Sequence, residues 1–514
     1  MRLPWRLAII VALCLMAVPS VAFPALAQNQ ALSLGLSPTQ GVPGTEITVS
    51  YLTTGNFTPN TQVDILFAGV WKTTVTTDND GKFTATILVP NTYRGGHPIR
   101  AEESTTIYAQ SNFNVESGLT VTPEEGQVGD TVTVIGRGYG EDETGIQLYF
   151  GGQRVLVEVA IEADPDGFWT EDFTIPDSVS GTHRIDSVPA ARHATFTVGP
   201  GIRLGRSSGS PGQSIAVTGG GFTANERNIS ILFAGEAVTA GIRSDDRGSW
   251  IEPFEVPEMP AGKYSVTAEG DRTLKADVGT IDFEVKPGIV LELDEGHVGM
   301  NVTAIGRGFA ASSNVTVLYE DIDVTEDIEV VTDENGTFEF TFAVPESRHG
   351  AREVTGEDDE GNETEQPGIF TMEEDPPPTP QPVSPTDGDR VGFAAKVRPG
   401  FRWEEVFDLS GVYYSLQIST SANVTAQGFV DPVMTLEGLS GNYTLERNEA
   451  LPHGTYYWIV QAVDGAENKS GWSEPESFRA GRLPLWAFIV IIVFIVLGAG
   501  GAGYYYAVRR RMYD

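Results

Sequence analysis

Four acidic turns hold the residues that come closest to a metal-binding pattern. They read Asp78-Asn79-Asp80-Gly81, Asp164-Pro165-Asp166-Gly167, Asp245-Asp246-Arg247-Gly248 and Asp333-Glu334-Asn335-Gly336. An EF-hand calcium loop also needs a bidentate Glu at its twelfth position, and counting from Asp78 places Val89 there. Asp and Asn also cap tight hairpin turns in which Gly takes a positive φ. We therefore predict turn capping for these aspartates, and we keep calcium as the alternative, at domain junctions where acidic loops meet.

One segment matches the Gly-x-Ser-x-Gly pattern of a hydrolase nucleophile, Gly205-Arg206-Ser207-Ser208-Gly209. That nucleophile needs a sharp strand-to-helix turn in an α/β sheet, which an all-β chain does not provide. The histidines show no His-Glu-x-x-His or similar ligand spacing and are expected at the surface: His97, His183, His193, His297, His349 and His453. We expect no catalytic, cofactor-binding or metal-binding residues.

The composition excludes one class of function and indicates a fold. With 70 acidic against 33 basic residues, the net charge of −37 repels phosphate backbones, so no nucleic-acid partner is expected. The chain holds 58 glycines, Thr and Val are frequent, and runs long enough for soluble helices are lacking. This composition is typical of an all-β protein with many turns.

A unit of about 85 residues occurs four times. Each copy has a glycine before a strand-like run, a glycine followed by an aromatic, and a turn with an aromatic two residues after its glycine. The leading glycines are Gly44, Gly129, Gly212 and Gly299, and the aromatics after the turns are Phe83, Trp169, Trp250 and Phe338. The period of two along a strand places those aromatics on one sheet face. Short alternating strands in units of this size predict two-sheet sandwiches.

The second copy carries a family resemblance. Gly129, the run Val132-Thr133-Val134-Ile135-Gly136-Arg137-Gly138-Tyr139 and Leu148-Tyr149-Phe150-Gly151-Gly152 resemble the IPT/TIG family of immunoglobulin-like domains. The resemblance covers roughly residues 32 to 374. The first copy departs from it at Thr54-Gly55-Asn56-Phe57, and the fourth replaces the Gly-Gly pair by Glu320-Asp321. The family implies a modular spacer or binding domain of bacterial or archaeal surface proteins and no reaction.

A different domain follows a proline-rich linker, Pro376-Pro377-Pro378-Thr379-Pro380-Gln381-Pro382, which favours extended polyproline II. Leu451-Pro452-His453-Gly454-Thr455-Tyr456 and Gly471-Trp472-Ser473 resemble fibronectin type III domains. The resemblance implies the role of the corner tyrosine for Tyr456.

Both ends of the chain predict export and anchoring. Arg2 and Arg6 precede the apolar run from Leu7 to Val18, and Ala25-Leu26-Ala27 reads as a cleavage site; this signal also contains the only cysteine, Cys14. Near the other end, 26 uncharged, mostly apolar residues lie between Arg482 and Arg509. That length spans a bilayer, and Arg509 to Arg511 belong on the cytoplasmic side. We predict a single-pass cell-membrane protein with a large extracytoplasmic N-terminal region.

The predicted fold class is all-β, with tandem immunoglobulin-like β-sandwiches and one transmembrane α-helix. The predicted parts are a signal peptide (1–27), four repeats (32–116, 117–200, 201–287 and 288–374), a linker (375–383), a fibronectin type III-like domain (384–480), a transmembrane helix (483–508) and a tail (509–514).

Two surface features leave alternatives open. Asn-x-Ser/Thr sequons occur at Asn56, Asn228, Asn301, Asn314, Asn335, Asn362, Asn423, Asn442 and Asn468. They either carry glycans or reflect the residue usage of hairpins. Trp71 has no aromatic counterpart in the other copies, so it belongs to a recognition patch or packs against a neighbouring loop.

We predict a non-catalytic, membrane-anchored cell-surface protein. Its stalk serves cell-envelope structure, adhesion or binding of a ligand, either a glycan or a protein. The alternative is an extracytoplasmic accessory subunit of an enzyme or receptor complex.

Overall fold

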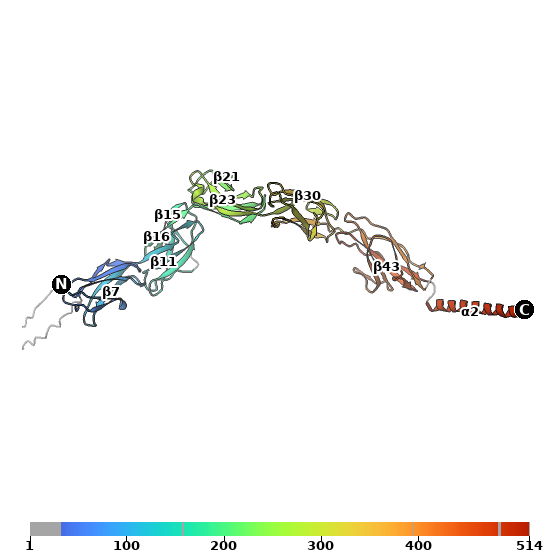
Figure 1. Cartoon of the computed structure of the whole chain (residues 1–514), viewed down its shortest axis with the longest axis horizontal. Helices are drawn as coiled ribbons and strands as arrows, with labels where there is room; N and C mark the ends of the chain where they lie inside the picture. Colours follow the sequence, from blue (N-terminus) through green and yellow to red (C-terminus); the bar gives the residue numbers. More distant parts are fainter. Residues whose placement is uncertain (1–31, 157–158, 394, 482–484, 513–514) are drawn as a thin grey trace, which may run out of the picture. The chain divides into compact units, whose positions relative to one another are not determined.

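The computed structural model describes residues 32–156, 159–393, 395–481 and 485–512 (Figure 1). The predicted signal peptide, residues 1–27, lies outside them. The chain divides into two compact units. One comprises Met1–Pro176 with Gly181–Val198, and the other Asp177–Ser180 with Gly199–Asp514.

The first unit contains two sandwiches, each with a three-stranded and a five-stranded sheet. In the first repeat the strand order of the three-stranded sheet is β1 (Gly35–Ser37), β3 (Glu46–Tyr51), β6 (Phe83–Leu88). The order of the five-stranded sheet is β2 (Gln40–Gly41), β8 (Tyr108–Val115), β7 (Gly95–Glu102), β4 (Gln62–Phe67), β5 (Val70–Thr76). In the second they are β9 (Gly118–Thr122), β11 (Thr131–Arg137) and β14 (Trp169–Thr174), and β10 (Glu125–Gln127), β16 (Arg192–Gly199), β15 (Gly181–Val188), β12 (Gln147–Phe150) and β13 (Gln153–Arg154).

The second unit repeats this strand order twice. In the third repeat the sheets are β17 (Gly201–Leu204), β19 (Ser214–Gly220) and β22 (Trp250–Glu255), and β18 (Ser208–Gly209), β24 (Ile281–Val285), β23 (Gly262–Glu269), β20 (Ile229–Phe233) and β21 (Glu236–Ile242), with a short helix α1 (Lys275–Val278). In the fourth they are β25 (Gly288–Leu291), β27 (Asn301–Arg307) and β30 (Phe338–Ala343), and β26 (Glu295–Gly296), β32 (Gly368–Met372), β31 (Gly350–Asp358), β28 (Val315–Tyr319) and β29 (Ile322–Asp323).

The C-terminal domain is a further sandwich. The strand order of its three-stranded sheet is β33 (Pro382–Ser384), β36 (Gly400–Trp403), β41 (Tyr443–Thr444). The order of its five-stranded sheet is β34 (Asp389–Val391), β44 (Glu476–Ala480), β43 (Gly454–Val463), β37 (Tyr413–Ser419), β40 (Pro432–Leu439). Two small pairs are β35 (Lys396–Val397) with β42 (Leu451–Pro452) and β38 (Val424–Thr425) with β39 (Gly428–Phe429). The Tyr456 hydroxyl donates to the Pro452 carbonyl oxygen at 3.3 Å, which confirms the corner-tyrosine role.

Alternate residues of the strands fill each core. On β4, for example, Val63, Ile65 and Phe67 are buried, whereas Asp64 and Leu66 point to the outer face. The four aromatics after the turns, Phe83, Trp169, Trp250 and Phe338, are all buried, as predicted. The all-β fold of tandem immunoglobulin-like sandwiches is therefore confirmed.

A glycine lies under the core aromatic in three of the four repeats. Gly136 pairs with Trp169 across β11 and β14, and a Cβ at Gly136 would overlap the indole ring. Gly219 under Trp250 and Gly306 under Phe338 repeat this contact. These glycines are therefore required by close packing.

The last described element is the helix α2 (Leu485–Arg511), with 27 residues, drawn at the C-terminal end of Figure 1. Its part Ile489–Arg511 is long and apolar enough to cross a membrane, and none of it is buried against the protein. Its last turn carries Arg509, Arg510 and Arg511.

Candidate functional site

The turn aspartates predicted as caps do cap their turns. The Asp78 carboxylate accepts the backbone N–H groups of Asp80 and Lys82, both at 2.8 Å. Asp164, Asp245 and Asp333 make the same pair of bonds in the other repeats. The hydrogen bond from Lys82 is the main reason why the pKa of Asp78 lies below its ordinary value.

The expectation of surface histidines is wrong for His97. This residue is only 4% exposed, and its Nε2 lies 2.8 Å from the Tyr93 carbonyl oxygen. Tyr264 and Tyr456 contact the carbonyl oxygen four residues upstream in the same way. His97 therefore takes the place of a corner tyrosine, which the sequence spacing alone did not reveal.

The Gly-x-Ser-x-Gly segment does not form a nucleophile turn. Ser208 and Gly209 make the two-residue strand β18, which pairs in parallel with β24. The backbone carbonyl of Ser207 accepts the N–H of Glu284, so this segment belongs to the sheet edge. The next element is the strand β19, whereas a nucleophile elbow requires a helix there.

A cluster of three carboxylates lies between the fourth repeat and the C-terminal domain, within one compact unit. Oxygen atoms of Glu373, Asp408 and Asp464 lie within 4.8 Å of one another. Glu373 ends the fourth repeat, whereas Asp408 and Asp464 belong to loops of the C-terminal domain. We call these three residues the junction cluster. None of the turn aspartates belongs to it.

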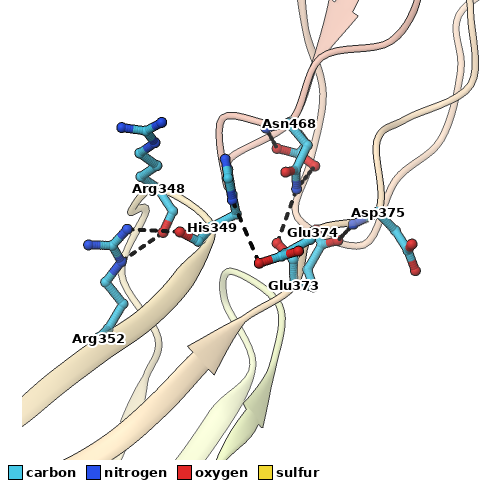
Figure 2. A network of polar contacts seen from close by, with 8 residues as sticks. Arg348, His349, Arg352, Glu373, Glu374, Asp375 and Asn468 are labelled. Carbon is cyan, nitrogen blue, oxygen red and sulfur yellow. Dashed lines mark hydrogen bonds and ion pairs between the residues drawn. The ribbon is translucent and has the colours of Figure 1, made fainter.

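Hydrogen bonds from both sides hold the junction cluster. The Ser410 hydroxyl donates to Glu373 Oε1 at 2.7 Å. The Asn468 amide donates to the Glu373 carbonyl oxygen at 3.1 Å (Figure 2). Asp464 accepts the backbone N–H groups of Ala466 and Asn468. The Asp408 carboxylate accepts the backbone N–H of Ser410 at 2.8 Å. Each carboxylate therefore accepts at least one hydrogen bond that holds a loop where the two domains meet.

Packing adds to these bonds. Ala466, from the C-terminal domain, is fully buried within the core of the fourth repeat. Its carbonyl oxygen accepts the N–H of His349 at 2.8 Å, and Val298 packs close to Gly465. The loop of residues 464–468 thus packs against the fourth repeat, with Ala466 in its core.

Burial raises the pKa of the Glu373 carboxyl above its ordinary value, and the negative charges of Asp464 and Asp408 act in the same direction. The Ser410 hydrogen bond opposes this shift. The geometry of the three carboxylates is one that could hold a cation, and the calcium alternative for acidic loops at domain junctions stays a prediction.

A second candidate site lies on the first repeat. Trp71 is 58% exposed, so it does not pack under a neighbouring loop. Ile65 pairs with Thr73 and Leu66 with Trp71, which leaves Lys72 as the extra residue of a β-bulge. The bulge brings Trp71 and Thr74 to the outer face, opposite Leu66 and Asp64.

Two rows of side chains cross this outer face from β5 through β4 and β7 to β8. The strand register aligns Trp71, Leu66, Arg100 and Gln110 in one row, and Thr74, Asp64, Glu102 and Tyr108 in the other. We call these eight residues the Trp71 face. The sequence singled out Trp71, but it did not reveal the residues beside it, since they come from four strands.

The fold defines a protein of tandem immunoglobulin-like sandwiches with a C-terminal apolar helix. No family model and no curated protein matches the sequence, so the IPT/TIG resemblance stays a prediction.

Several solved structures show a weak likeness to this chain. A tetra-tandem repeat from the extending region of a large adhesion protein is 14% identical, with 71% of this chain and 99% of that one covered and a TM-score of 0.22. The Escherichia coli adhesin FdeC is 14% identical, with 50% and 96% covered and a TM-score of 0.15. The FN1–FN3 domains of chicken contactin are 12% identical, with 55% and 99% covered and a TM-score of 0.19. These likenesses do not bear on ligand or activity.

Proposed function

We propose that this chain is a non-catalytic, membrane-anchored protein of the cell surface that presents a ligand-binding sandwich for adhesion. The observation that carries this proposal is α2, an apolar helix of 27 residues that follows the last sandwich and ends in three arginines. The arginine cluster favours a cytoplasmic C-terminus, which leaves all five sandwiches on the outer side.

The junction cluster supports a display role. Glu373, Ser410 and Asn468 tie the fourth repeat to the C-terminal domain by side-chain hydrogen bonds. Ala466 buries apolar surface across the same junction. Such contacts would restrict the relative motion of two successive sandwiches, which suits a stalk.

Protease treatment of intact cells tests the proposal. We expect an added protease to degrade the sandwiches and to leave a short fragment detected through an epitope tag after Asp514. Permeabilised cells serve as the control, in which the tag is also lost. A full-length chain that survives on intact cells and is cleaved only after permeabilisation would contradict surface display.

The alternative of an accessory subunit predicts a different result. Purification of the tagged chain in mild detergent would then yield a second membrane protein in fixed stoichiometry. We expect the chain to purify without such a partner.

A further inference from the structure

We propose that the Trp71 face of the first repeat binds a neutral carbohydrate chain. This inference rests on the proposed function of surface display, and it names the ligand class and the contact surface.

The presentation of Trp71 is the first argument. The indole N–H donates to Thr74 Oγ1 at 3.2 Å, and the Thr74 hydroxyl in turn donates to Asp64. These two hydrogen bonds fix the Trp71 ring. Binding of a ligand that stacks on the ring therefore costs little side-chain entropy. A tryptophan that is more than half exposed and also held in place is suited to stacking.

The polar groups around the ring are the second argument. Asp64 accepts hydrogen bonds, the Arg100 guanidinium donates them, and the Gln110 amide does both. These side chains come from adjacent strands, which are spaced about 4.8 Å apart. A sugar ring offers an apolar C–H face with hydroxyls around it that both donate and accept. The Trp71 face matches both features at once.

Charge selects the ligand class. Arg100 pairs with Glu102 at 2.7 Å and lies over the Tyr108 ring at 3.9 Å, so its charge is compensated within the face. Asp64 adds a further carboxylate, and the whole chain carries a net charge of −37. Anionic polymers are therefore repelled, whereas a neutral glycan is not.

The apolar area argues against a protein partner. The face presents one large exposed ring, that of Trp71, while Leu66 and the Tyr108 ring are only partly exposed, and charged or polar groups occupy the other positions. A stable protein interface needs a fully buried apolar core within about 800 Å² on each partner. A sugar chain needs only the ring and its polar neighbours.

The other repeats show that the fold does not require Trp71. The register that pairs Leu66 with Trp71 pairs Tyr149 with Arg154, Leu232 with Ala237 and Leu318 with Asp323. The third repeat also has the same turn, with Ala234 and Gly235 at positive φ as in Ala68 and Gly69. Ala237 therefore marks what Trp71→Ala would leave.

The experiment measures binding of the full-length chain in detergent to neutral probes. The neutral probes are cellohexaose, chitohexaose, xylohexaose and mannohexaose, each titrated calorimetrically. Polygalacturonate is titrated in the same way as the anionic comparison. We expect binding of at least one neutral probe, and about tenfold weaker binding for Trp71→Ala. Trp71→Phe should retain most of the affinity, and Gln110→Ala should lose part of it.

Two controls keep the result interpretable. Trp71→Arg introduces the residue that the second repeat has at this position, so it tests the loss with a second side chain that the fold tolerates. Ala237→Trp in the Trp71→Ala background places an exposed tryptophan on the third repeat. There Thr267 stands in place of Arg100, so we expect no recovery.

Several outcomes would overturn the inference. The first is that Trp71→Ala binds the neutral probe as tightly as the unaltered chain does, and the second is that Ala237→Trp restores binding in the Trp71→Ala background. The third is that the unaltered chain binds polygalacturonate alone, and the fourth is that it binds no neutral probe. A purified protein ligand that is lost with Trp71→Ala would likewise replace the glycan. None of these results affects surface display, which the protease experiment tests separately.

Discussion

The side-chain amide of Asn468 donates to the backbone carbonyl oxygen of Glu373 at 3.1 Å, across the junction between the C-terminal domain and the fourth repeat. A second hydrogen bond of the same amide reaches Asp464 at 3.0 Å. Asn468 is only 7% exposed, and both of its amide protons are engaged. This sequon is therefore closed to a glycan in the folded protein, whereas Asn423 is exposed.

The first prediction concerns Asn468→Ala. The change leaves the Glu373 carbonyl and one Asp464 oxygen without their donor, so we expect a loss of about 1–3 kcal/mol in the free energy of unfolding. Urea unfolding of the last two sandwiches measures it. Asn423→Ala, at an exposed sequon of the same domain, should stay close to the unaltered protein. An equal loss in both variants would argue against the junction contact.

The second prediction concerns the pH dependence of the junction. Because the pKa of Glu373 is raised, its protonated form favours the folded state, and this contribution is lost as pH rises through the raised pKa. We expect Glu373→Gln to raise the melting temperature at neutral pH. The gain should disappear below the ordinary glutamate value of 4.5. The neighbouring Glu374→Gln, at a more exposed carboxyl, is the control and should show no such pH-dependent gain.

The third prediction concerns calcium. The carboxylates of the junction cluster already accept hydrogen bonds: Glu373 and Asp408 from Ser410, and Asp464 from Ala466 and Asn468. We therefore expect the melting temperature of the full-length chain to stay unchanged on addition of millimolar calcium or of a chelator. A rise with calcium that Asp408→Asn abolishes would instead assign a metal site to the cluster.

The fourth prediction concerns Gly136→Ala. The added Cβ would overlap the ring of Trp169, and overpacking of this kind costs about 1–3 kcal/mol of stability. Gly96→Ala is the matched control, because its Cβ would meet open space. Thermal unfolding followed by tryptophan fluorescence measures both. If Gly136→Ala and Gly96→Ala have the same melting temperature, close packing against Trp169 does not explain why residue 136 is a glycine.

Local sequence patterns predict most of the fold. Alternation predicted which aromatics are buried, because side chains of a strand point to opposite faces at every second residue. Asp78 and its counterparts were predicted as caps because an aspartate binds backbone N–H groups only two and four residues away. The apolar helix near the C-terminus was likewise evident from its composition.

The candidate sites were less predictable, since they depend on contacts between distant segments. The calcium alternative concerns domain junctions where acidic loops meet, yet nothing in the spacing selects Glu373, Asp408 and Asp464. Sequence spacing places His97 at the surface, whereas in the fold it stacks on the buried Phe67 ring and contacts the Tyr93 carbonyl oxygen.

The sequence by itself determined the four repeats, the hairpin turns, the core aromatics and the apolar helix, because each depends on residues close together in the chain. Tertiary structure alone decided that Trp71 shares one sheet face with Asp64 and Arg100. A single bulged residue sets the register between strands, and that register determines which side chains share a face.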